Sequence, residues 1–198
     1  SADVEHCQRA VRDRHAIGVR VGSADVMKAR PRRIGGDLVP QAERLLGVRM
    51  APDIFPVEVG SKIPAFTAVD LATGDSVPLS HYQGNVVLLN IWATWCEPCR
   101  VEMPSMQQLY DSLGPQGLKI VAVSIDQADA DVVRDFQRNY GLTFDILQDQ
   151  SRAIERVFQT TGVPESFVLN REGRIVKKVI GAHDWASIAN QELVRRLL

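Results

Sequence analysis

The sequence has little cysteine: three residues among 198, too few to staple a small domain together with disulfides. Two of them, Cys96 and Cys99, form a C-x-x-C pair, and Cys7 stands apart near the beginning of the chain. The C-x-x-C spacing leaves three interpretations open, namely half of a zinc site, a redox pair or coincidence. A disulfide-rich scaffold is therefore excluded, and the pair needs its own explanation.

Long apolar runs are also absent, since no stretch approaches the ~18–20 uninterrupted apolar residues that a membrane-spanning helix requires. The hydrophobic share of 45% and the charged share of 24% are those of an ordinary globular protein. The length suits one well-packed domain with an extension. Because the sequence starts at Ser1 rather than Met, removal of an upstream targeting or anchoring segment stays open.

Neither sign of charge dominates the whole chain, whose net charge is −1, but the two signs are unevenly distributed. Residues 1–50 carry ten Lys and Arg against six Asp and Glu, and the remainder carries thirteen against eighteen. The arginines lack interleaved aromatic residues, which disfavours nucleic-acid binding. Residues 1–56 lack sustained periodicity, so they predict an irregular basic extension or linker. We expect this arm to be solvated rather than bound to nucleic acid or anionic lipid.

From residue 57 onward, apolar patterns alternate with turn signals and predict one domain over residues 57–198. Strands alternate with helices, which is typical of a parallel sheet with right-handed crossovers, and two hairpins add antiparallel strands. The predicted class is α/β. The predicted strands are 65–70, 76–79, 85–91, 118–125, 144–147, 166–169 and 175–180, and the predicted helices are 97–113, 129–140, 151–158 and 185–198.

The C-x-x-C pair lies where a buried strand, ending at Ile91, gives way to a helix that starts at the cysteines. The free backbone N–H groups and the dipole at a helix N-terminus stabilise negative charge. The pKa of a thiol in this position is therefore lower than its usual value of ~8.5. We expect Cys96 to attack a disulfide sulfur as the thiolate, and the better buried Cys99, one turn on, to resolve the mixed disulfide.

Three neighbours of the pair are candidate contacts for an incoming chain. Trp95 offers an apolar platform, although a partly buried turn aromatic is the alternative interpretation. Pro98 suits the first helical turn, where its missing N–H costs nothing. Glu97 opposes thiolate formation at Cys96 to a small extent. We predict that all three contribute to substrate binding.

Zinc binding is the principal alternative, because tetrahedral zinc would need two further ligands besides the C-x-x-C pair. Strand, turn, C-x-x-C and helix in succession favour redox chemistry instead, and no metal is predicted. The further ligands that the sequence offers are Cys7, His6, His15, His81 and His183, none of them in a second paired spacing.

The segment WATWCEPCR, residues 92–100, resembles the active-site signature of the thioredoxin superfamily, and in particular its TlpA/ResA/DsbE-like branch. Pro104 matches the proline inside the active-site helix. Val163-Pro164 matches the cis-proline loop, which binds the substrate backbone. Residues 129–147 match the inserted helix–strand unit of the branch. The resemblance covers about residues 57–198 and implies a thioredoxin-like sandwich, with a central mixed sheet flanked by helices and an N-terminal hairpin.

The same resemblance gives Glu102 a role, because a glutamate three residues past the second cysteine lies close to the thiol pair in this branch. Such a carboxylate, partly buried, has a raised pKa and can exchange protons with a thiol. An exposed glutamate on the helix surface is the alternative interpretation. Thioredoxin itself has a buried Asp where this chain has Asn90, so Glu102 is the available proton carrier.

The resemblance further implies a reductase of protein disulfides such as those of apocytochrome c, working outside the cytoplasm, and we expect a monomer. Its electrons would come from a membrane thiol donor, with no cofactor beyond the Cys96–Cys99 disulfide. An anchor upstream of residue 1 is expected, and a cytoplasmic role is the alternative. A peroxiredoxin-like thiol peroxidase and a non-catalytic thioredoxin-fold binding module are the rival functions. The peroxidase is disfavoured because residues 91–95, Ile-Trp-Ala-Thr-Trp, lack the proline that precedes a peroxidatic cysteine.

Overall fold

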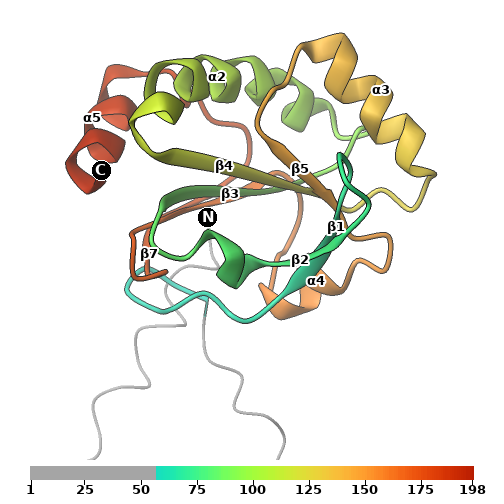
Figure 1. Ribbon diagram of the computed structural model, residues 1–198, viewed down its shortest axis with the longest axis horizontal. Coiled ribbons are helices and arrows are strands. Elements are labelled where there is room, and N and C mark those ends of the chain that lie inside the picture. Colours follow the sequence, from blue (N-terminus) through green and yellow to red (C-terminus); the bar gives the residue numbers. More distant parts are fainter. Residues whose placement is uncertain (1–56) are drawn as a thin grey trace, which may run out of the picture. The chain divides into compact units, whose positions relative to one another are not determined.

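A computed structural model describes residues 57–198, which contain one seven-stranded sheet with strand order β2-β1-β5-β4-β3-β6-β7 (Figure 1). The strands are β1 (Thr67–Asp70), β2 (Ser76–Pro78), β3 (Val86–Trp92), β4 (Leu118–Ser124), β5 (Asp145–Gln148), β6 (Glu165–Leu169) and β7 (Ile175–Ile180). The helices are η1 (Leu79–Tyr82), α2 (Glu97–Leu113), η2 (Gly114–Gln116), α3 (Ala130–Tyr140), α4 (Ala153–Val157) and α5 (Ile188–Leu197).

The sheet is mixed, as the sequence predicts. Strands β3, β4 and β5 run parallel to one another, while β1 pairs antiparallel with β5 and β6 pairs antiparallel with β3. The hairpin strands β2 and β7 complete the two edges. The α3–β5 unit extends the parallel part beyond β4, which confirms the inserted helix–strand unit.

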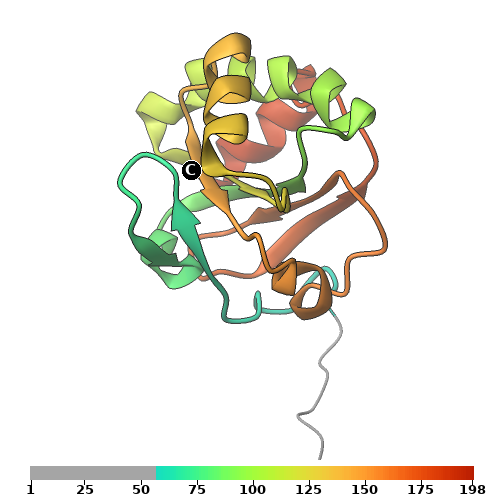
Figure 2. The ribbon, with the colours of Figure 1, turned by 90° about the vertical axis from the view of Figure 1, so that its right-hand side faces the viewer.

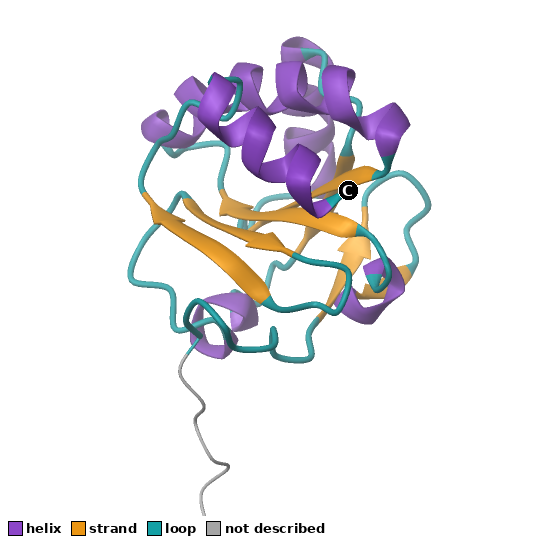
Figure 3. Ribbon diagram, turned by 90° about the vertical axis from the view of Figure 1, so that its left-hand side faces the viewer, coloured by secondary structure: helices purple, strands orange, loops and turns teal. Residues whose placement is uncertain are grey.

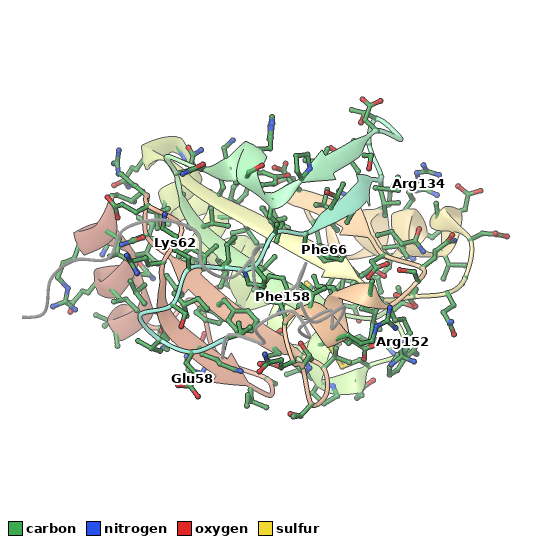
Figure 4. The ribbon with its side chains drawn as sticks, turned by 90° about the horizontal axis from the view of Figure 1, so that it is seen from below. Glu58, Lys62, Phe66, Arg134, Arg152 and Phe158 are labelled. Atoms are coloured by element: carbon green, nitrogen blue, oxygen red, sulfur yellow. A yellow bond between two sulfur atoms is a disulfide. The ribbon has the colours of Figure 1, made fainter. Side chains whose placement is uncertain are left out.

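Helices α2, α3 and α5 cover one face of the sheet (Figures 1 and 3). The other face is covered by η1, α4 and the chain that leads into β1 (Figure 2). On this second face, Phe66 and Phe158 meet edge to face with ring centroids 6.5 Å apart, as Figure 4 shows from below. The ring centroid of Phe167 on β6 lies 5.4 Å from that of Phe158, so the aromatic cluster continues onto the sheet.

Strand β3 is buried along its whole length, which explains its continuous apolar sequence. A strand covered by helices on one side and loops on the other has no solvated face, so it needs no alternation of polar residues. Burial of each large aliphatic side chain contributes about 1.5–3 kcal/mol. Strand β3 therefore anchors the centre of the core, and the turn that follows Trp92 starts from a rigid position.

The start of one helix differs from the sequence prediction, and residues 57–63 add pairing for which no element is predicted. Helix α5 begins at Ile188 rather than at Trp185, because Trp185 is buried in the preceding loop and its backbone N–H donates to Ser105 Oγ at 3.0 Å. Residues 57–63 run along β7, where Gly60 N donates to Ile175 O at 2.8 Å. Lys62 in this strap, residues 57–63, forms an isolated antiparallel bridge to Arg174, which directly precedes β7.

Within residues 57–198, no helix is both long and apolar enough to cross a membrane. The predicted basic extension over residues 1–56, including Cys7, lies outside the described residues. Its boundary at residue 57 stays a prediction.

Candidate active site

The site is built on the first turn of α2, where Cys96 is the N-cap residue. Its backbone is extended, with φ −84° and ψ 105°, and its sulfur accepts a hydrogen bond from the backbone N–H of Cys99 at 3.2 Å. The two sulfurs are joined in a disulfide of 2.09 Å, with the Cα atoms 5.3 Å apart. The helix N-terminus thus points one free N–H group, that of Cys99, at the sulfur of Cys96.

The two cysteines differ in exposure in the direction that their predicted roles require. Cys96 is 5% exposed, whereas Cys99 is completely buried. An incoming disulfide therefore reaches Cys96 first. The Cys96 sulfur also lies 3.5 Å from the carbonyl oxygen of Val163, and the Val163–Pro164 peptide bond is cis, as predicted.

The residues predicted to contact a substrate differ in their exposure to solvent. Trp95 is 62% exposed, although it belongs to a turn between buried elements, so its indole is free to meet another chain. Glu97 and Pro98 are exposed on the first turn of α2, and Glu97 pairs with Arg100 at 3.3 Å. Pro164, in contrast, is buried, and Val163 is half-buried. Their roles in binding stay predictions.

Glu102 lies one helical turn beyond Cys99 on the same side of α2. It is 2% exposed, so the alternative of a solvated surface glutamate is wrong. Its Oε1 accepts from Asn90 Nδ2 at 2.8 Å, and its Oε2 accepts from the backbone N–H of His183 at 3.2 Å. Asn90 also donates to Ser166 Oγ at 2.9 Å, which ties β3, β6 and α2 together beneath the disulfide.

Burial raises the pKa of Glu102 from its ordinary value of 4.5 to about 7. The cause is desolvation, because the charged form loses its water on entering the core. Hydrogen bonds from Asn90, from the His183 backbone and from the Trp185 side chain favour the charged form and oppose this shift. A carboxyl group with a pKa near neutrality is suited both to accept and to release a proton at physiological pH.

Asp126, which the sequence interpretation missed, anchors the turn before the cysteines. It follows β4, and its carboxylate accepts from the backbone N–H of Thr94 at 2.9 Å and from Thr94 Oγ1 at 2.6 Å. Ser124 Oγ donates to the same carboxylate at 2.6 Å. Asp126 and Thr94 are 32 residues apart in the chain. The only available signal was that parallel strands bring their C-terminal ends to one edge of a sheet.

The loop between β7 and α5 is the second feature that the sequence did not reveal. Gly181 N donates to Pro164 O at 2.8 Å, and His183 N donates to Glu102 two residues later. Ser105 of α2 donates to His183 O at 3.3 Å. The loop thus connects the cis-proline segment with the carboxylate behind the disulfide.

Residues 57–198 contain no group of three or more His, Cys, Asp or Glu side chains arranged to hold a metal ion. Of the further ligands considered for zinc, His81 and His183 fall in this range and join no such group. His6, Cys7 and His15 lie outside the described residues.

Residues 59–178 match the model of the AhpC/TSA family, which covers more than half of the chain. The chain belongs to the AhpC/TSA family. This AhpC/TSA protein is 34% identical to the thiol-disulfide oxidoreductase ResA of Bacillus subtilis over 138 residues, 67% of this chain and 76% of the relative. ResA of Bacillus thuringiensis is also 34% identical, over 63% of this chain and 71% of the relative.

Among solved structures, the thioredoxin domain of a thiol-disulfide oxidoreductase from Bacteroides vulgatus is similar, with a TM-score of 0.62 and 25% identity. The match covers 71% of this chain and 99% of that domain. These similarities confirm the thioredoxin-like fold and the ResA-like resemblance. Together with the Cys96–Cys99 disulfide, they establish the AhpC/TSA protein as a thiol–disulfide oxidoreductase.

Proposed function

We propose that this thiol–disulfide oxidoreductase works as a reductase of protein disulfides outside the cytoplasm, with apocytochrome c as its substrate. The observation that carries the proposal is the C-x-x-C pair at the start of α2 with the buried Glu102 one turn behind it. Similarity to the thiol-disulfide oxidoreductase ResA supports disulfide exchange, and the resemblance to the TlpA/ResA/DsbE-like branch supports the reducing direction. A membrane-bound dithiol is the proposed electron donor, and an anchor upstream of residue 1 would keep the two together.

In the first step, the Cys96 thiolate attacks one sulfur of the partner's disulfide. A mixed disulfide forms, and the partner's other sulfur leaves as a thiolate that takes up a proton. The negative charge on Cys96 before attack is stabilised by the N-terminus of α2 and by the backbone N–H of Cys99. The exposed Trp95 and the carbonyl of Val163 flank the point of attack.

In the second step, Cys99 attacks the sulfur of Cys96. Cys99 first gives its proton to the Glu102 carboxylate, and the partner's second sulfur leaves and takes up a proton. Two electrons have then passed to the partner, and the protein holds the Cys96–Cys99 disulfide that the structure contains. The membrane dithiol would reduce this disulfide by the same two steps in reverse.

The direct test uses protein that has been reduced with dithiothreitol and freed of the reagent. A peptide with an internal disulfide in a Cys-x-x-Cys-His sequence, the haem-attachment motif of c-type cytochromes, is the substrate. We expect two peptide thiols to appear for each disulfide formed in the protein. A peptide of the same composition without the motif serves as the control for specificity. Absence of peptide thiols, with normal alkylation of the Cys96–Cys99 dithiol, would contradict the proposal.

The direction of electron flow is tested by the reduction potential of the pair, measured in glutathione or dithiothreitol buffers. A reductase should equilibrate at or below about −220 mV, the range of glutathione itself. A value near −120 mV, typical of strong oxidants with this fold, would contradict reduction as the physiological direction.

The two rival functions give different results with the same protein. A thiol peroxidase would consume hydrogen peroxide at a rate that Cys96→Ser abolishes, whereas we expect negligible consumption. A non-catalytic binding module would leave insulin disulfides unreduced even with dithiothreitol-reduced protein. Fractionation of the producing cells, with an antibody against the domain, tests the extracytoplasmic location.

A further inference from the structure

A polar cluster lies between β7 and α5, on the face of the sheet that carries α2. It consists of Lys177 on β7, His183 in the following loop and Asn190 on α5. Lys177 Nζ donates to Asn190 Oδ1 at 2.7 Å. The His183 Nε2 atom lies 3.0 Å from Asn190 Nδ2 and 3.3 Å from Lys177 Nζ. Asn190 is only 3% exposed, so these bonds replace the water that its amide would otherwise bind.

The cluster fixes the histidine ring in one arrangement. An ammonium group can only donate, so Lys177 Nζ is the donor and His183 Nε2 the acceptor in their 3.3 Å contact. The same Asn190 amide nitrogen lies 2.6 Å from Asp184 O and 2.9 Å from Ser187 Oγ, both of which accept. A single buried amide therefore fastens the loop that runs from His183 to the start of α5.

That loop is also the one that reaches the active-site carboxylate. The His183 side chain belongs to the cluster, while its backbone N–H donates to Glu102 Oε2 at 3.2 Å. The same residue is thus held from one side by Lys177 and Asn190, and it donates to Glu102 on the other. No atom of Lys177 or Asn190 has a hydrogen bond to Glu102 among the described contacts, so the hydrogen-bonded route from Asn190 to the carboxylate runs through the loop that carries His183.

We propose that Lys177, His183 and Asn190 are positioning residues, which hold the His183 backbone N–H on Glu102 and thereby set how tightly Glu102 keeps its proton. The proposal rests on the proposed function only for its consequence in catalysis. A backbone N–H that donates to a carboxylate favours the charged form. Loosening the loop would weaken that bond, and Glu102 would then hold its proton to higher pH.

The groups around Glu102 determine which variant is informative. Its own helix contributes Cys99, β3 contributes the neutral Asn90 and β6 the neutral Ser166. The loop before α5 contributes the neutral indole of Trp185. The positive charge of Lys177 lies on β7 behind the loop. Removing that charge would by itself raise the proton affinity of a nearby carboxylate, whatever happens to the loop. Asn190→Ala removes the fastening without changing any charge, so it isolates the proposed effect.

The test is a pH titration of the ¹³C carboxyl resonance of Glu102 in the oxidised protein, with the resonance assigned by its loss in Glu102→Gln. We expect Asn190→Ala to raise the titration midpoint by about one pH unit, a tenfold gain in proton affinity. His183→Ala removes the ring but keeps the backbone N–H, and we expect the same direction of change. It also serves as the second variant if Asn190→Ala does not fold.

Val194→Ala is the matched control, because Val194 is a fully buried apolar residue of α5 outside the cluster. It should destabilise the packing of α5 and leave the Glu102 midpoint unchanged. The proposal is overturned if folded Asn190→Ala and His183→Ala titrate like the original protein, or if Val194→Ala shifts the midpoint equally. Failure of Glu102→Gln to slow disulfide reduction would sink the proton-transfer role in the proposed function, but it would leave this titration result intact.

Discussion

Glu102 combines nearly complete burial with a group that is ordinarily charged at neutral pH. Hydrogen bonds from Asn90, from the His183 backbone and from the Trp185 side chain support the charged form. Desolvation outweighs them and raises the pKa of Glu102 to about 7. At physiological pH, the carboxyl group is therefore poised between its two protonation states.

Replacement of Glu102 by Gln should slow the resolving step, because Cys99 then has no carboxylate to accept its proton. In the original protein, the carboxylate fraction rises through pH 7, so the rate of resolution should rise with a midpoint of about 7. In Glu102→Gln, the rate at pH 7 should fall about a hundredfold, and its rise should move to the higher pH at which a thiol ionises unaided. Single-turnover stopped-flow kinetics from pH 5 to 9 measure both effects.

The control for this substitution is Glu192→Gln, which changes an exposed glutamate on α5. It should leave both the rate and the pH profile unchanged. If Glu102→Gln keeps the midpoint near 7, another group accepts the proton of Cys99.

The two cysteines should be separable by substitution. Cys99→Ser should trap the partner as a mixed disulfide on Cys96, since the resolving thiol is absent, whereas Cys96→Ser should form no adduct because Cys99 is buried. Mass spectrometry after incubation with an oxidised peptide distinguishes the two. An adduct on Cys99 of the Cys96→Ser protein would reverse the assignment of attacking and resolving sulfurs.

At the scale of elements, the start of α2 depends on a neighbouring strand. The turn between β3 and α2 is held by the carboxylate of Asp126, which takes three donors from Thr94 and Ser124. This carboxylate fixes the position of the turn relative to β4. The orientation of the first turn of α2, and so the field that acts on Cys96, follows from that anchor.

Asp126→Ala should therefore affect both stability and reactivity. Leaving the buried donors without an acceptor costs about 1–3 kcal/mol each at most, so we expect a total loss of roughly 2–4 kcal/mol in urea unfolding. The alkylation rate of reduced Cys96 by iodoacetamide should fall several-fold. Asp126→Asn keeps one acceptor oxygen and should recover part of both. An unchanged alkylation rate in folded Asp126→Ala would show that the anchor serves stability alone.

The sequence predicted some elements better than others for physical reasons. A strand buried on both faces, such as β3, has an unbroken apolar sequence and is recognisable by itself. The amphipathic pattern predicts a start of α5 three residues too early, because it includes Trp185, whose backbone N–H donates to Ser105 Oγ on another helix. The helix pattern cannot reveal a loop that is held by a contact distant in the chain.

At the scale of the whole molecule, the burial of Glu102 makes folding depend on pH. The unfolded chain releases the proton of Glu102 near pH 4.5, while the folded protein holds it until about 7. Stability should therefore fall as the pH rises between these values, by about 3 kcal/mol at most. Glu102→Gln lacks this dependence. The unfolding free energy of the variant minus that of the original protein should therefore increase from pH 4 to 8. Urea titrations of both oxidised proteins measure the difference, and a pH-independent difference would contradict the raised pKa.

The sequence predicts the fold class, the strand–helix order and the C-x-x-C site, because each depends on patterns within contiguous segments. The network behind the disulfide was accessible only in part. Glu102 follows the motif at a fixed spacing, so the resemblance identified it. Asp126, Ser166 and His183 reach the same site from distant parts of the chain. Their contribution depends on tertiary contacts, for which no local pattern exists.

The strap of residues 57–63 along β7 has a consequence for self-association. Sheet edges with unpaired backbone groups invite other chains to add strands, which leads to aggregation. Here the strap hydrogen-bonds to the first residue of β7, Ile175, and to Gly173 in the turn before it. The opposite edge, β2, has only three residues and ends at Pro78, which has no N–H to donate. A truncation that removes residues 57–63 would expose the β7 edge, and light scattering of that shortened protein should reveal oligomers.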